Sequence, residues 1–148
     1  RLANAAAHVP LLGAAGEARD QLRWFEERLA ADHSDWKIVV GHHPILSSGN
    51  HGESPGVVEH VKPLLERYGV QAYFNGHEHD LEHLTEQGVD YICSGSGALS
   101  RQIDAVPQSQ FAYADVGFAS CLLGADVLTL RFHDASAAVI YETQIARA

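Results

Sequence analysis

Two groups of histidines follow two apolar segments of the sequence. The segments read VVGHHPILSSGNHG at residues 39–52 and FNGHEHDLEH at residues 74–83, and the histidines are His42, His43, His51, His77, His79 and His83. Neutral imidazole is the commonest metal ligand among side chains, and its pKa near neutrality also lets it hold or release a proton. His77 and His79 lie two residues apart, so in an extended segment they project to the same side and can bind one ion or two adjacent ions.

The elements that precede the histidines are expected to bring the two groups together. WKIVVG, before His42, and VQAYFNG, before His77, are short runs of apolar residues that end at glycine, which is typical of buried strands. Between them, residues 56–68 predict a helix with a defect at Pro63. A strand, a helix and a strand in this order form a right-handed unit with parallel strands, and ligand sites lie beyond the carboxyl ends of such strands.

The other segments complete the prediction of a mixed α/β half-sandwich in which strands pack with two helices. Residues 1–16 are expected to form a loop, and residues 17–32 an amphipathic helix. After residue 80, short strands separated by turn residues indicate an antiparallel meander, interrupted by a loop over residues 95–114.

Composition narrows the classes of function. A chain of 148 residues can form one domain with a core, and its formal charge of −9, without a basic stripe, excludes nucleic acid as a partner. No apolar run is long enough to span a bilayer. Cys93 and Cys121 lie in strand-like segments and are interpreted as two buried thiols, with one bridge left open as an alternative. His60 and His133, in a predicted helix and a predicted strand, are expected to be structural.

The two histidine motifs resemble those of a known family. VVGHHP is similar to the Val-x-x-His motif of the purple acid phosphatases, which belong to the calcineurin-like metallophosphoesterases, and GHEH is similar to their Gly-His-x-His motif. His77 follows His42 by 35 residues and His51 follows it by 9, as in the small tartrate-resistant type of these enzymes. The resemblance extends to QLRWFEERLAA, YICSGSG and GFASCLL, so it covers most of the chain.

The resemblance implies a role for each histidine in hydrolysis of a phosphomonoester. His42 and His77 would bind a divalent ion (zinc, manganese or iron(II)), and His79 would bind a neighbouring iron(III), which gives a binuclear metal centre. His51 would reach the substrate phosphate or protonate the leaving alkoxide, and His43 would line the substrate pocket. Two cations about 3.5–4 Å apart neutralise the phosphate oxygens and activate water for in-line attack. Asp80 and His83 are expected to lie behind the ligands or at the surface.

The same resemblance implies that part of the enzyme is missing from these residues. The family has a four-layer αββα sandwich, of which residues 1–148 would form a single partial domain: the C-terminal half, a mixed β-sheet with flanking helices. The family's Gly-Asp-x-Gly, Gly-Asp-x-x-Tyr and Gly-Asn-His motifs do not occur here, so the bridging carboxylate is expected from an N-terminal half. The 148 residues alone are expected to be inactive, with an apolar strand edge at WKIVVG that needs a partner.

Three other interpretations stay open. The chain can belong to another calcineurin-like phosphodiesterase, since fold and motifs are shared. It can be a non-catalytic metal-binding remnant that keeps the fold. It can also be a plain α/β domain with incidental loop histidines, although the positions of the histidines after the strands, the glycines before them and their spacing all argue against this. The resemblance suggests a secreted, lysosomal or periplasmic protein.

Overall fold

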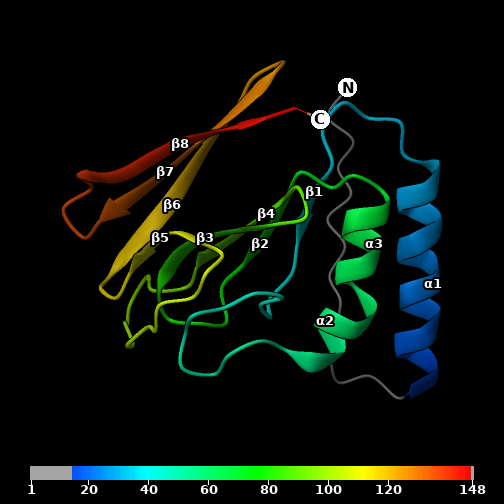
Figure 1. Cartoon of the computed structure of the whole chain (residues 1–148), viewed down its shortest axis with the longest axis horizontal. Coiled ribbons are helices and arrows are strands. Elements are labelled where there is room, and N and C mark those ends of the chain that lie inside the picture. Colours follow the sequence, from blue (N-terminus) through cyan, green and yellow to red (C-terminus); the bar gives the residue numbers. More distant parts are fainter. Residues whose placement is uncertain (1–14, 148) are drawn as a thin grey trace.

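The computed structural model describes residues 15–147 and arranges them in three layers (Figure 1). The helical layer contains α1 (Ala15–Ala31), α2 (Pro55–His60) and α3 (Lys62–Arg67). The five-stranded sheet lies next to it, and a three-stranded sheet covers the opposite face. The predicted α/β architecture, a mixed sheet with flanking helices, is confirmed, whereas the loop expected over residues 1–16 lies outside the described residues except where α1 begins.

The five-stranded sheet has the order β1-β2-β4-β3-β5. Its strands are β1 (Ile38–Val40), β2 (Ala72–Asn75), β3 (Leu81–Glu86), β4 (Val89–Ser94) and β5 (Ser109–Tyr113). β1, β2 and β4 run parallel, with Val39 opposite Tyr73, and β3 runs antiparallel to both of its neighbours. The predicted parallel unit of strand, helix and strand is therefore confirmed, and β1 forms the edge of the sheet.

The three-stranded sheet is an antiparallel meander of β6 (Gly117–Leu123), β7 (Val127–Asp134) and β8 (Val139–Ala146). The prediction of one meander after residue 80 is therefore wrong for β4, which pairs with β2 in parallel. The reason is that β4 is buried on both faces: Tyr91 packs in the core beneath the helices and Ile92 in the core between the sheets. Such a strand belongs in the interior of a mixed sheet.

The helix predicted over residues 56–68 is confirmed with its break, whereas the loop predicted over residues 95–114 is interrupted by a strand. The helix over 56–68 is split, as expected from Pro63, because α2 ends at His60 and α3 begins at Lys62. The loop over 95–114 contains β5, whose Phe111 packs against the core between the sheets. Because β5 contains polar residues, its sequence lacks the apolar pattern from which the other strands were predicted.

The two cysteines are free, so the disulfide left open by the sequence is not formed. Cys93 on β4 is buried as predicted, but Cys121 on β6 is exposed. The difference follows from their sheets, since β4 lies between two layers and β6 is an edge strand. Among the described residues, no helix is long and apolar enough to cross a membrane.

Candidate metal centre

The two histidine loops begin at the carboxyl ends of the neighbouring parallel strands β1 and β2. His42 is the second residue after β1, and His77 is the second residue after β2. The backbone joins the loops directly, because the amides of Gly76 and His77 both donate to the carbonyl of His42, at 3.2 and 3.0 Å. Parallel pairing of the strands therefore fixes the relative position of the two histidines, as the sequence predicts.

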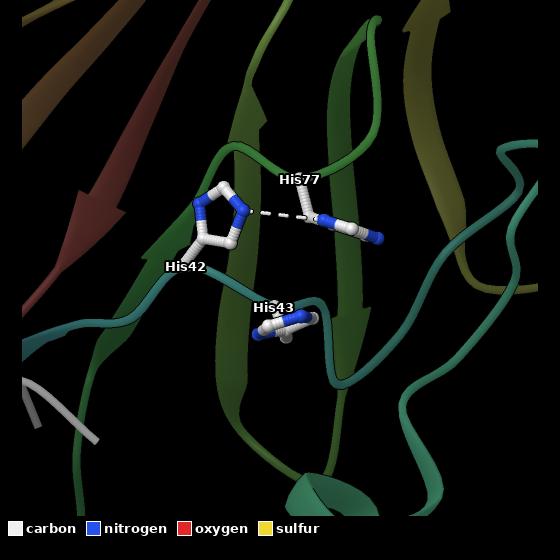
Figure 2. Close-up of side chains that lie close together, drawn as sticks. All are labelled: His42, His43 and His77. Atoms are coloured by element: carbon white, nitrogen blue, oxygen red, sulfur yellow. Dashed lines mark hydrogen bonds between the residues drawn. The ribbon is translucent and has the colours of Figure 1, made fainter. Parts of the chain in front are cut away.

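His42 and His77 point toward each other in Figure 2. Nε2 of His42 lies 3.2 Å from Nδ1 of His77, and the ring planes are inclined by 80°. Two nitrogens that bind one zinc-like ion at 2.0–2.1 Å, with angles of 90–110°, lie roughly 2.9–3.4 Å apart. The observed separation falls within this range, so these two side chains fit a shared divalent cation.

His43 lies closer to this pair than the sequence suggests. Ligand atoms of His42, His43 and His77 all lie within 4.8 Å of one another. Burial, together with the neighbouring His77 and His42, lowers the pKa of His43. Burial, together with His42 and His51, likewise lowers the pKa of His77. A lowered pKa keeps an imidazole neutral near neutral pH, and the neutral ring is the form that binds a metal ion.

His79 does not join this group of three. Its ring is partly buried, and its Nδ1 is inaccessible to solvent and has no hydrogen-bond partner among the described residues. A buried polar atom without a hydrogen-bond partner lowers the free energy of unfolding by about 1–3 kcal/mol, so such atoms are rare in folded proteins. The structure therefore brings together two of the predicted ligands, His42 and His77. The third, His79, follows His77 by two residues and has a buried ring nitrogen without a hydrogen-bond partner among the described residues.

His51 is held by two charged residues that sequence reasoning missed. Its backbone amide donates to Oε1 of Glu78 at 2.8 Å, and its Nδ1 lies 3.2 Å from Oε2 of the same fully buried side chain. On its other side, Nε2 of His51 lies 2.6 Å from Nη1 of Arg101. The ring centroid of His51 is 5.0 Å from that of His77, so His51 borders the candidate metal site. Glu78 is the variable residue of GHEH, which is the one signal that pointed to it.

Buried carboxylates fasten the loop that carries His51. Glu82 accepts hydrogen bonds from the backbone amide of Ser48, at 3.1 Å, and from the Ser48 hydroxyl. Burial raises the pKa of Glu82 to about 8 and that of Asp80 to about 6. Asp80 is buried, as expected for a residue behind the ligands, and its Oδ1 has no partner among the described residues.

The remaining histidines take structural or surface positions. His83 is buried and joins three strands, since its ring nitrogens lie 2.6 Å from Oδ1 of Asp90 and 3.0 Å from the Tyr141 hydroxyl. His60 is exposed on α2. His133 contacts the Ser120 hydroxyl at 2.8 Å and stacks on Phe118. The expectation that His133 is structural agrees with these contacts, whereas His60 only adds to the surface.

The raised pKa of Glu82 predicts a loss of stability toward alkaline pH. Between the ordinary value of 4.5 and about 8, the folded protein holds a proton that the unfolded chain has released. The free energy of unfolding should therefore fall as pH rises through this window, by at most about 1.4 kcal/mol per pH unit for one proton. Glu82→Gln keeps an acceptor for Ser48 and should flatten this slope. Urea unfolding of the full-length gene product at pH 5, 6, 7 and 8 measures it.

The matched control for this prediction is Glu59→Gln, which changes an exposed carboxylate on α2. This variant should keep the slope of the unmodified protein. Equal slopes for the unmodified protein and Glu82→Gln would contradict the assignment of the titration to Glu82.

Comparison with known proteins relates the chain to phosphatases. A family model described as calcineurin-like phosphoesterase matches residues 8–81. Tartrate-resistant acid phosphatase type 5 of Rattus norvegicus is 36% identical over 143 residues, which cover 89% of this chain and 44% of that protein. The chain thus spans less than half the length of the curated relatives it matches.

Solved structures share the fold. A purple acid phosphatase from yellow lupin (Lupinus luteus) seeds superposes with a TM-score of 0.81 at 22% identity, over 96% of this chain and 30% of that one. GAP50, described as the anchor in the inner membrane complex of Plasmodium, superposes with a TM-score of 0.87 at 24% identity, over 93% of this chain and 45% of that one.

Proposed function

Because the chain belongs to the calcineurin-like phosphoesterase family, we propose that it supplies the C-terminal metal ligands of an acid phosphatase that hydrolyses phosphate monoesters. In this proposal residues 1–148 form a single partial domain, the C-terminal half of the catalytic domain. The observation that carries the proposal is the 3.2 Å separation between Nε2 of His42 and Nδ1 of His77. Two neutral imidazole nitrogens at this distance fit a shared divalent cation.

The proposed centre is binuclear. His42 and His77 would hold zinc, manganese or iron(II), and His79 would hold a neighbouring iron(III) through a ring that now has an unsatisfied nitrogen. When bound, the two cations would neutralise the phosphate oxygens and activate water. Three imidazoles contribute no negative charge, so carboxylate ligands from an N-terminal half of the enzyme would complete the set.

The chain's own residues would position the substrate. His51 borders His77 and is fixed by Glu78, which accepts a hydrogen bond from its backbone and contacts its Nδ1. This contact leaves Nε2 of His51 facing Nη1 of Arg101 instead of Glu78, and from this position Nε2 would meet the phosphate or the leaving oxygen. His43 would line the same pocket beside His77.

The resemblance to the purple acid phosphatases also leads us to propose a secreted, lysosomal or periplasmic location. Two alternatives remain in view. The fold alone does not imply catalysis, because a solved structure of this fold is described as an anchor. A related phosphodiesterase would use the same ligands.

One assay separates these functions. The full-length gene product is tested with p-nitrophenyl phosphate and bis(p-nitrophenyl) phosphate, before and after removal of metal by a chelator and after its return. We expect hydrolysis of the monoester that is lost on chelation and restored by iron with zinc. Faster hydrolysis of the diester would favour the phosphodiesterase, and metal binding without turnover would favour the non-catalytic remnant.

A further inference from the structure

Arg101 makes an unusual contact with the ring of His51. Its Nη1 lies 2.6 Å from Nε2 and 3.2 Å from Nδ1 of that ring. A guanidinium group can only donate hydrogen bonds, so Nε2 of His51 accepts one here. A bond from a permanent cation to a neutral ring is one that a negatively charged ligand can readily replace.

The backbone holds Arg101 in this place from two sides. Its amide donates to the carbonyl of His79 at 2.9 Å. Farther along the same segment, the amide of Asp104 donates to the carbonyl of Ser48 at 2.8 Å, and Ile103 forms an isolated bridge with Gly49. The segment 101–104 is therefore tied to both histidine loops, and the position of Arg101 over His51 is built into the fold.

Arg101 has no carboxylate partner among residues 15–147. The buried carboxylate of Glu78 contacts the backbone amide and Nδ1 of His51 instead. A cation that has no counter-ion among residues 15–147 and lies against an imidazole ring is typical of a site for an anion.

We propose that Arg101 binds the phosphate group of the substrate and selects monoesters over diesters. The inference rests on the proposed function, because it assigns the substrate class of the same site. A monoester presents a dianion with three free oxygens, whereas a diester presents one charge and two. The planar fork of a guanidinium matches two phosphate oxygens of either ester, so the selection would come from the second negative charge of the monoester, and the N–H groups of Arg101 would move from His51 to the phosphate oxygens.

The test is a calorimetric titration of the metal-loaded, full-length gene product with inorganic phosphate, which measures the Kd for phosphate. Arg101→Ala should raise the Kd for phosphate about tenfold, which is the order expected for a half-exposed charge-assisted bond. Arg101→Lys keeps the positive charge but not the planar guanidinium, so its Kd for phosphate should lie between those of the unmodified protein and Arg101→Ala. The matched control is Arg131→Ala, which removes an arginine that pairs with Glu142 on the three-stranded sheet.

Kinetics provide a second readout in the same variants. Arg101→Ala should raise KM for p-nitrophenyl phosphate with a smaller change in kcat, and should raise KM for bis(p-nitrophenyl) phosphate by a smaller factor, because the diester carries one negative charge instead of two. The preference for the monoester over the diester should therefore fall in Arg101→Ala, whereas Arg131→Ala should keep it. Thermal unfolding of each variant checks that the fold is intact, and Arg101→Lys decides the matter if Arg101→Ala is unfolded.

The outcomes distinguish this inference from the proposed function. If the unmodified protein turns over no monoester, the proposed function fails, and the phosphate titration still decides whether Arg101 binds the anion. If the unmodified protein is active but Arg101→Ala and Arg101→Lys keep the phosphate Kd of Arg131→Ala, the inference is overturned.

Discussion

Replacing His77 with alanine is expected to lower turnover of a phosphate monoester about a thousandfold and to release one metal ion. The substitution removes the nitrogen that lies 3.2 Å from Nε2 of His42, so a cation shared by the two rings loses half of the ligands that this pair provides. A bound cation contributes several kcal/mol to the transition state, and each 1.4 kcal/mol is about tenfold in rate. Metal analysis and steady-state kinetics of the full-length gene product measure both effects.

The arrangement also predicts how substitutions combine. His42→Ala should resemble His77→Ala, and the double variant should be little worse than either, because both changes remove the same ion. His60→Ala is the matched control, since it removes an exposed histidine from α2. Full metal content and normal turnover in His77→Ala would contradict a shared cation.

Gly95→Ala is expected to destabilise the protein by about 3 kcal/mol or more and to weaken metal binding. A Cβ atom at this position would lie 1.8 Å from the carbonyl oxygen of Glu78 and 2.2 Å from that of Gly76. Both oxygens belong to the backbone that flanks His77, so the clash cannot be relieved by rotating a side chain. Forcing extra atoms into a closely packed place costs about 1–3 kcal/mol, and more where backbone must move.

The control for Gly95→Ala is two residues away. A Cβ atom at Gly97 would meet nothing within 4 Å, so Gly97→Ala should leave stability and metal content almost unchanged. Urea unfolding of both variants, with metal analysis before unfolding, gives the comparison. Equal stability of the two variants would show that the loop after β2 yields to the added methyl group.

The sequence predicted the strands and histidines whose signals are local. β1 and β2 are short apolar runs that end at glycine, and a parallel pair necessarily brings the residues after them to one edge. His42 and His77 therefore met as expected. The roles given to His42, His77, His79, His51 and His43 in binding metal and substrate stay predictions.

Features that depend on distant packing could not be predicted. Arg101 meets His51 only because the segment 101–104 crosses to the loop after β1, a pairing without a local pattern. The exposure of Cys121 depends on β6 being the edge of a second sheet. β4 was assigned to a meander because turn residues separate it from the strands next to it in the sequence, whereas its parallel pairing with β2 has no local signal.

A crystal structure of the metal-loaded, full-length gene product, with anomalous diffraction collected at the absorption edge of the divalent ion, shows directly whether His42 and His77 share a cation. We expect an anomalous peak about 2.0–2.1 Å from both Nε2 of His42 and Nδ1 of His77. A peak elsewhere, or these two nitrogens hydrogen-bonded to each other in crystals that contain the ion, would contradict it.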